Sequence, residues 1–193
     1  MPNTSATGGA LLPTSSPGLI QGDALDDFLQ AWVVSLCGID PTMVRPRWQS
    51  APANIPVFGT DWCAFGITLY DKETFAAELH FATGNGYNEV RLNEEVTCMV
   101  SFYGPNSASY VSLLSDNMQA SQNREILSVN AMGLVSAGNI TPMPELIKER
   151  WLKRFDLSFI IRRQIIRNYN VLSITSAQTL LNNEHYIETI NVP

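Results

Sequence analysis

The side chains best suited to acid–base or metal chemistry are scarce in this 193-residue sequence. Its two histidines are His80 and His185, and neutral imidazole is a common general base and metal ligand. Two are too few for a convincing site. His80 alternates with apolar residues in a strand-like pattern, so we expect it to face solvent, and His185 lies in a weakly patterned tail. Neither histidine is assigned a catalytic role.

The cysteines are three in number, Cys37, Cys63 and Cys98, and they are widely spaced. No C-x-x-C pair is present to begin a metal site, and an odd number does not suggest a disulfide framework. Cys63 and Cys98 fall on the apolar faces of expected strands, where free cysteine behaves as a small hydrophobic residue rather than a nucleophile. We expect reduced, mostly buried thiols.

Three further motifs have structural explanations. Gly84-Asn85-Gly86 lacks the third glycine of a phosphate loop and no helical pattern follows, so it predicts a turn. Glu94 and Glu95 are neighbours on an expected strand and face opposite sides, so they cannot act as a catalytic pair. Asp61-Trp62 could line a pocket, although an aromatic anchor at a strand start is the simpler interpretation. We expect no catalytic residue, no cofactor and no metal.

Basic residues gather between Lys148 and Arg167. Before residue 148 there are five basic and fourteen acidic residues, which gives a net charge of −9. From residue 148 onward there are seven basic and four acidic residues, which gives a net charge of +3. The overall charge of −6 opposes general nucleic-acid binding, whereas opposite signs within one chain favour head-to-tail association of copies. Arg162, Arg163 and Arg167 are therefore candidate interface residues. The alternatives are a solvated strand face and a nucleic-acid contact.

The elements that must position these residues begin with a flexible arm and a helix. Residues 1–22 are rich in Ser, Thr, Gly and Pro, which predicts an arm that stays flexible until a partner orders it. From Asp23, a plausible N-cap, apolar residues repeat at helical spacing until Gly38. Four prolines between residues 40 and 57 then predict an extended connection of about 20 residues.

The rest of the sequence predicts strands and two short helical segments. Alternating apolar residues predict half-buried strands at 61–70, 75–82 and 94–103, joined as an antiparallel meander with a hairpin turn at 71–74. The later patterns predict helices at about 105–120 and 125–129, strands at 132–137, 155–169 and 171–176, and a loop at 141–144. The strand at 155–169 is longer than usual and should project beyond its sheet.

These patterns predict an α+β protein with a mostly antiparallel twisted sheet, about two to three flanking helices and long projecting strands. We divide it into the arm at 1–22, one domain at 23–178 and a C-terminal extension at 179–193. No apolar run reaches the roughly 18 residues of a membrane span, and the N-terminus lacks a secretion-signal pattern. We therefore expect a soluble protein without a membrane partner.

Several blocks of sequence, taken in order, resemble the phage neck or tail terminator family. They are Val44-Arg45-Pro46-Arg47-Trp48, Thr60-Asp61-Trp62-Cys63-Ala64-Phe65-Gly66, Phe102-Tyr103-Gly104-Pro105-Asn106, Asn123-Arg124-Glu125, Arg150-Trp151 and Arg163 to Leu172. The resemblance covers about Leu25 to Ser176. It adds Arg150 and Trp151 to the candidate subunit interface.

The resemblance implies a virion structural protein without enzymatic activity. Proteins of this family are typically homohexameric rings at the neck end of the tail, which end polymerisation of the tail-tube protein and join the tail to the neck or head connector protein. The genome passes through the axial channel without sequence-specific binding, and the protein assembles in the host cytoplasm before it resides in the virion. Another neck component, such as an adaptor or head-completion protein, is the alternative, and a soluble hydrolase that uses His80 is a more remote one.

Overall fold

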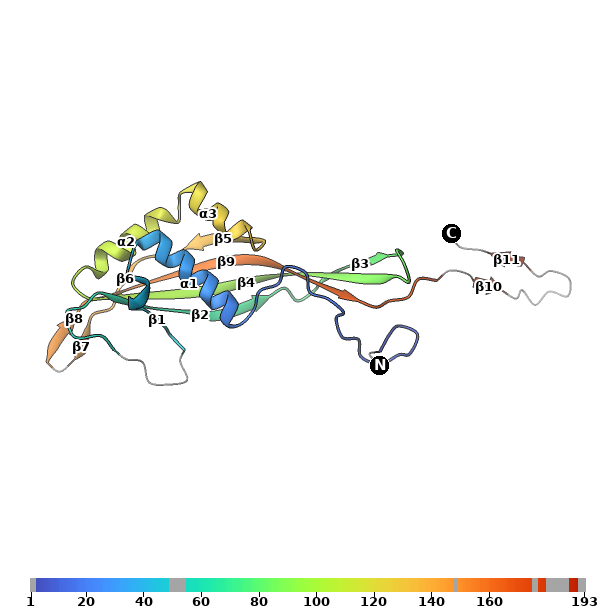
Figure 1. Ribbon diagram of the computed structural model, residues 1–193, viewed down its shortest axis with the longest axis horizontal. Coiled ribbons are helices and arrows are strands. Elements are labelled where there is room, and N and C mark those ends of the chain that lie inside the picture. The colour runs from blue at the N-terminus through green and yellow to red at the C-terminus, as the bar shows by residue number, and fades with distance from the viewer. Residues whose placement is uncertain (1–2, 49–54, 148, 175–176, 180–187, 191–193) are drawn as a thin grey trace. The chain divides into compact units, whose positions relative to one another are not determined.

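A computed structural model describes residues 3–48, 55–147, 149–174, 177–179 and 188–190, and it confirms an α+β fold (Figure 1). The helices are α1 (Asp23–Cys37), α2 (Ser107–Asn117) and α3 (Ser121–Ser128), with a 3-10 turn, η1, at Pro41–Met43. The strands are β1 (Val44–Pro46), β2 (Trp62–Lys72), β3 (Ala77–Phe81), β4 (Tyr87–Tyr103), β5 (Met132–Ala137), β6 (Thr141–Pro142), β7 (Glu145–Ile147), β8 (Arg150–Leu152), β9 (Arg154–Tyr169), β10 (Ala177–Thr179) and β11 (Glu188–Ile190).

The described residues divide into two compact units. The larger unit contains residues 18–75 and 92–165, and the smaller contains residues 1–17, 76–91 and 166–193 as far as they are described. Strands β4 and β9 contribute residues to both units. The main sheet has the order β1-β2-β4-β9-β5, in which β1 runs parallel to β2, while the β2–β4 and β5–β9 pairs are antiparallel.

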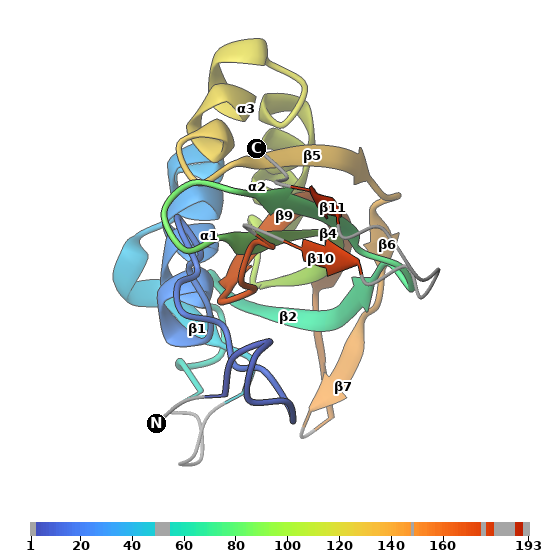
Figure 2. The same ribbon diagram turned by 90° about the vertical axis from the view of Figure 1, so that its right-hand side faces the viewer.

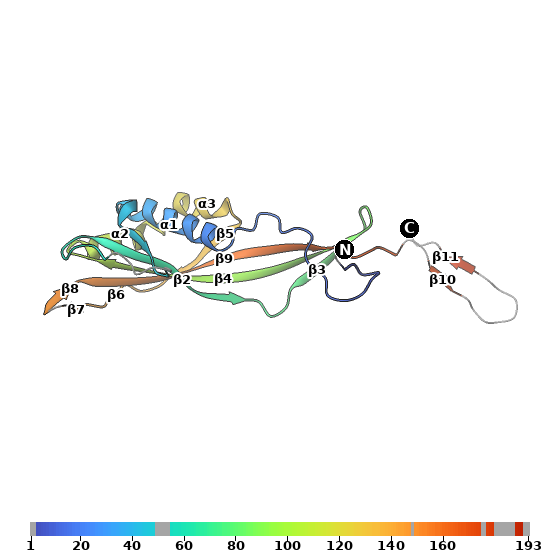
Figure 3. The same ribbon diagram turned by 60° about the horizontal axis from the view of Figure 1, so that its bottom comes forward.

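The core of the larger unit lies between one face of this sheet and the helices. Figure 3 shows α1 and α3 on the same side of the strands. Alternation along β9 sends Leu157, Phe159 and Ile161 into this core, and each is at most 1% exposed. On α1, the Trp32 indole lies edge-on to Phe159 with ring centroids 5.7 Å apart and donates a hydrogen bond to the Asn123 carbonyl at 2.8 Å. The apolar face of α1 thus packs on the inward-facing side chains of β9.

The predicted first helix is confirmed, but its N-cap prediction is wrong. Gly22 occupies the N-cap position and no side chain caps the helix, whereas Gly38 ends it in the left-handed conformation with φ of 68°. The predicted strand at Met132–Ala137 and the long strand β9 are also confirmed. The expected helices at about 105–120 and 125–129 correspond to α2 and α3.

The predicted meander is wrong in its pairing. β2 and β3 do not pair with each other; both pair antiparallel with β4, β2 at residues 94–103 and β3 at 87–91. Residues 71–74 therefore do not form a hairpin turn, and the Glu73 amide donates to the Asn93 carbonyl at 3.1 Å. The turn before β4 lies where Asn85-Gly86 predicted it, with Gly84 and Gly86 both at positive φ. The expected burial of strand 75–82 is also wrong, because β3 is exposed along most of its length.

Other differences lie in the connections. The region expected to be one extended connection contains η1 and strand β1 in its first part, and residues 49–54 lie outside the described residues. The loop expected at 141–144 contains the short strand β6, which pairs with β9. Residues 171–174 do not form the expected strand, and 175–176 are not described. Instead, the amide of Ser173 donates to the Asn85 carbonyl at 3.1 Å.

Candidate assembly surface

Arg162 and Arg163 lie on opposite faces of β9, as strand alternation requires. Arg163 faces the core side and is only 4% exposed. Its guanidinium donates to the Glu94 carboxylate at 2.7 Å and to the Ile20 carbonyl at 2.5 Å. Lys72 lies 3.3 Å from the second oxygen of Glu94. The charge of Arg163 is thus neutralised inside its own subunit.

Arg162 and Arg167 differ from Arg163 in their exposure and in their hydrogen-bond partners. Arg162 donates to Glu95 Oε1 at 3.1 and 2.6 Å, but its side chain remains 58% exposed and can exchange this partner for another. Arg167 lies in the smaller unit and donates to Ser16 Oγ at 3.2 Å, close to the bond from the Thr14 amide to the Asn168 carbonyl at 2.7 Å. These bonds connect the predicted arm to the end of β9.

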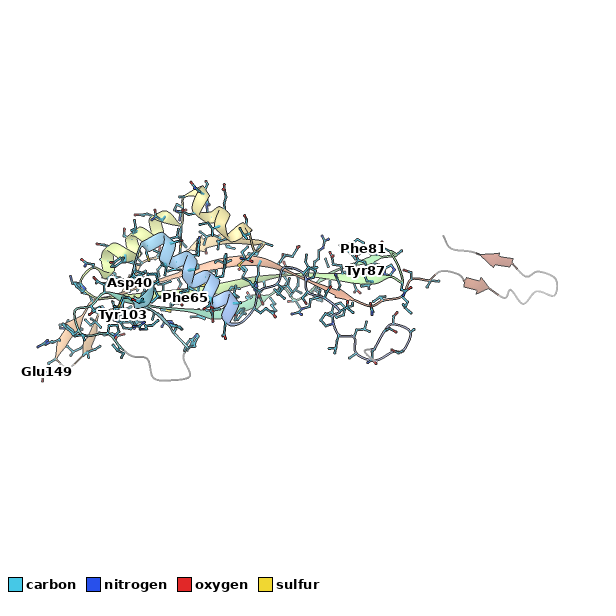
Figure 4. All side chains as sticks on the ribbon, in the orientation of Figure 1. Asp40, Phe65, Phe81, Tyr87, Tyr103 and Glu149 are labelled. Carbon is cyan, nitrogen blue, oxygen red and sulfur yellow. The ribbon has the colours of Figure 1, made fainter. Side chains whose placement is uncertain are left out.

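Arg150 and Trp151 lie on β8, in the hairpin that β8 forms with β7. Trp151 is 68% exposed, and the Arg150 guanidinium lies over the Phe58 ring, 5.6 Å from its centroid. Figure 4 shows Glu149 at the tip of this hairpin. The hairpin therefore presents a large aromatic side chain on one face and a cation on the other, and both residue types are enriched at protein interfaces.

A cavity of about 420 Å³ lies between this hairpin and the segment that precedes β2. Its lining consists mainly of apolar side chains: Ile55, Pro56, Val57, Phe58, Gly59, Thr60, Trp62, Ile147, Arg150 and Leu152. We call the exposed apolar residues Ile55, Val57, Phe58, Leu146, Ile147 and Trp151, together with Arg150, the hairpin surface. A concentration of exposed large apolar side chains of this kind is typical of a protein–protein contact.

Asp61 and Trp62 hold the base of the hairpin surface in place. Asp61 accepts hydrogen bonds from the Asn106 amide and side chain, both at 2.8 Å, and Trp62 stacks on Tyr103 with ring centroids 4.1 Å apart. The anchor interpretation is therefore confirmed, and Trp62 also lines the cavity. Gly104, at φ of 110°, allows the close approach of Asp61 that this arrangement needs.

Arg154 fastens the hairpin to the sheet. Its guanidinium donates to both Asp156 oxygens at 2.8 Å, to Glu145 on β7 and to Ser101 at 3.4 Å, and it lies 5.4 Å from the Tyr103 ring centroid. Hydrogen bonding to Asp156 raises the pKa of Arg154, and the bond to Glu145 acts in the same direction. The cation is permanent, so the hairpin is held by a charge that does not titrate.

The sequence did not single out Ile55, Val57 or Phe58. They lie in a proline-punctuated segment without a two- or 3.6-residue period, so periodicity gives no reason to group them with the hairpin. A usable signal was present, because three large apolar residues within four positions of a predicted connection have no evident core to fill. Arg150-Trp151 was singled out. Arg150 lines this cavity, and Trp151 lines a neighbouring pocket together with Phe58.

His80 has hydrogen-bonding partners that the sequence did not reveal. Its ring nitrogens lie 2.6 Å from Asn88 Oδ1 and 3.0 Å from Ser173 Oγ, an order that resembles an orienting group, a base and a nucleophile. His80 is nevertheless exposed and Ser173 is half-buried, and the Ser173 amide, which an oxyanion would need, already donates to the Asn85 carbonyl. The cluster serves to fasten residue 173 to the β3–β4 hairpin, at whose end Phe81 stacks on Tyr87 (Figure 4).

The cysteines and acidic groups form no metal or nucleophile site in the described part of the chain. Cys37, Cys63 and Cys98 are free and buried, as predicted. Burial raises the pKa of all three thiols, that of Cys98 to about 12, so each is a poor nucleophile. Over the described ranges, no three His, Cys, Asp or Glu side chains are grouped to hold a metal ion, and no helix is both long and apolar enough to cross a membrane.

The α+β fold and the exposed apolar residues of the hairpin surface are typical of an assembly subunit that contacts another protein. The sequence profile of the phage neck terminator protein family matches residues 23–189, which is most of the chain. The chain belongs to the phage neck terminator protein family. No curated protein matched it. Membership makes it a structural protein of the phage neck, located in the tail and neck of the virion, where it contacts other tail and head proteins.

Proposed function

We propose that this protein forms a closed ring at the neck end of the tail, ends polymerisation of the tail tube and joins the tail to the head connector. The hairpin surface is the observation that carries the proposal, because it leaves several large apolar side chains without a cover in the isolated chain. Covering them requires a partner. In a ring of identical subunits each copy supplies that partner, and closure limits growth.

The proposed ring is a homohexamer with an axial channel for the genome. The sequence carries a net charge of −6, which supports passage of DNA without retention, since affinity for phosphates depends on clustered cations that release counterions. Arg150, Trp151 and the exposed Arg162 are the proposed interface residues. Arg163 and Arg167 have intramolecular partners and enter the proposal only through the position of β9.

We also propose that residues 23–178 act as the ring-forming domain, with residues 1–22 and 179–193 available to contact other neck proteins. The end of the arm is held at Ile20 by Arg163, whereas residues 14–16 contact β9 through a few hydrogen bonds to Arg167 and Asn168. Such a segment can exchange its partners at low cost during assembly.

Deletion of the gene tests the proposal. We expect tails of uneven and excessive length, with wild-type length restored when the gene is supplied in trans. Tails of normal length that fail to join heads would instead indicate an adaptor or head-completion protein. Negative-stain imaging and native mass spectrometry of the purified protein, alone and with tail tube, should show hexameric rings with a central hole. A protein that stays monomeric with tail tube, together with tails of normal length, would refute the proposal.

A further inference from the structure

Beyond Arg163, β9 has an edge along which no strand lies in the described part of the chain. The order of the main sheet is β1-β2-β4-β9-β5, and Figure 2 shows β5 above β9 and β2 below β4. On the β5 side, β9 pairs with β6 at residues 155–156 and with β5 from Phe159 to Arg163. β9 itself continues to Tyr169. Residues 164–169 therefore extend past the last residue that a described strand pairs on this side.

The N-terminal arm takes the place of a strand on this edge. Ser15 and Asn168 form an isolated antiparallel bridge. The Thr14 amide donates to the Asn168 carbonyl at 2.7 Å, and the Asn168 backbone amide donates to the Ser15 carbonyl at 3.0 Å. Alternation along β9 puts these backbone groups of Asn168 on the same edge as the Ser158 carbonyl, which accepts from the Gly138 amide at 2.7 Å. Because Gly138 follows β5, the arm lies on the β5 side of β9.

The contact between the arm and this edge is polar and superficial. Its other hydrogen bonds involve hydroxyl and amide groups: Thr14 to the Asn168 carbonyl at 3.0 Å, the Asn168 side chain to Ser15 Oγ at 3.0 Å, Arg167 to Ser16 Oγ at 3.2 Å and the Leu172 amide to Ser5 Oγ at 2.8 Å. No described residue from 3 to 17 is buried, and residues 1–22 contain no charged side chain. The contact therefore rests on exposed hydrogen bonds, which contribute little net stability because water offers similar bonds.

A glycine separates this part of the arm from the segment that is fixed to the core. Gly18 has a φ of 64°, and no atom lies within 4 Å of the position that a Cβ would take. Two residues later, Ile20 packs against the core, and its carbonyl accepts from Arg163 at 2.5 Å. Because glycine adopts either sign of φ, rotation at Gly18 can move residues 3–17 away while Ile20 stays in place.

We propose that residues 3–17 are a removable cap for the edge of β9. The cap prevents this edge from pairing with a strand of another molecule while the subunit is free, and its release exposes the backbone donor and acceptor of Asn168. An uncovered strand edge is a ready site for pairing with a further chain, and proteins cover such edges with loops. This inference concerns the free subunit and does not depend on ring closure.

Removal of residues 1–17 tests the cap. We expect the truncated protein to associate at least about tenfold more strongly than the full-length protein, because the edge of β9 is uncovered. Thioflavin T fluorescence and the infrared band of intermolecular β-sheet measure this kind of association, and circular dichroism shows whether each variant is folded. Removal of residues 1–10 is the matched control, since it leaves Thr14, Ser15 and Ser16 on β9, and this variant should behave as the full-length protein does.

Asn168→Pro in the protein that lacks residues 1–17 tests which edge is responsible. Proline has no amide hydrogen, and the backbone amide of Asn168 faces the arm, so the change blocks a new strand on this edge. Association should then return to the level of the full-length protein. Association that persists in this variant, or a folded truncated protein that associates no more than the full-length protein, overturns the proposal.

Hydrogen exchange of the full-length protein gives a second measurement, which remains decisive if the truncated protein does not fold. The Asn168 backbone amide should exchange at least about tenfold faster than the amides of residues 159–163, which lie between β4 and β5, because the arm opens alone. Equal exchange rates would mean that the arm leaves only when the sheet opens, and the cap would then not be removable.

Discussion

Arg162 and Arg163 are adjacent in sequence but differ in what their charges do. Arg163 is buried with Glu94, and Arg162 pairs with Glu95 at the surface. The two pairs join adjacent positions of β4 and β9 and lie on opposite faces of one sheet. They therefore form a matched comparison of a buried and an exposed ion pair within one protein.

Removal of Arg163 is expected to be much more damaging than removal of Arg162. Arg163→Ala leaves Glu94, which is 2% exposed, with only Lys72 as an ionic partner, and we expect a loss of about 3–5 kcal/mol in the free energy of unfolding. Arg162→Ala should lose less than about 1 kcal/mol, since its pair is hydrated. Urea denaturation of the two variants measures both values.

The double variant Glu94→Gln, Arg163→Met tests whether the loss of stability comes from the unpaired charge of Glu94. If the single variant fails because it leaves an unpaired buried charge, the double variant should recover part of the loss. Equal losses for Arg162→Ala and Arg163→Ala would contradict the buried role of Arg163.

At the scale of elements, the sequence predicted where most helices and strands lie, but it did not predict which strands pair. The two-residue period of Leu157, Phe159 and Ile161 located β9, and the same period places Arg163 on the buried face. It contains no information on Glu94, which is 69 positions away. The separation of β2 and β3 was also hidden, because the short segment between them resembles a hairpin turn.

The candidate surface was predictable only in part for the same reason. A local resemblance identified Arg150 and Trp151 as candidates. The position of Arg150 over Phe58, in contrast, depends on the packing of Leu152 against Ala64 and Tyr103. Contacts of this kind join residues that are 49 to 92 positions apart in the sequence. Local periodicity does not encode them.

Gly104 connects β4 to α2, and replacement by alanine tests how tightly that junction is packed. A Cβ there would lie 2.5 Å from Asp61 Oδ1 and 2.6 Å from the Thr60 carbonyl, at a φ that L-residues rarely adopt. We expect Gly104→Ala to lose about 1–3 kcal/mol or more and to loosen the base of the hairpin surface. Thermal denaturation followed by circular dichroism measures the loss.

Gly133→Ala is the matched control, because a Cβ at Gly133, on β5, meets no atom within 4 Å. Its melting temperature should stay close to that of the wild-type protein. A Gly104→Ala variant as stable as Gly133→Ala would show that the junction can relax.

At the scale of the whole molecule, the three cysteines report on the integrity of one core. Cys37 lies on α1, Cys63 on β2 and Cys98 on β4, and all three are at most 1% exposed. With the pKa of Cys98 raised to about 12, only about one thiol in ten thousand is ionised at pH 8 in the folded protein. We expect all three thiols to react with a disulfide reagent at one common slow rate, set by global unfolding.

Peptide mapping after timed labelling separates the three rates, and denatured protein serves as the reference for full reactivity. A cysteine that reacts well before the other two, with no change in circular dichroism, would show that its element opens independently.

The order of strands in the main sheet has a consequence for biosynthesis. β9 lies between β4 and β5 in the sheet, yet it follows both of them along the chain. Until the ribosome has released residues 154–169, β4 lacks a neighbour on one side and β5 has no strand on which to pair. Completion of the sheet must therefore wait until residues 154–169 are available. A polypeptide that is terminated before β9 cannot complete the sheet, and it exposes the unpaired edges of β4 and β5.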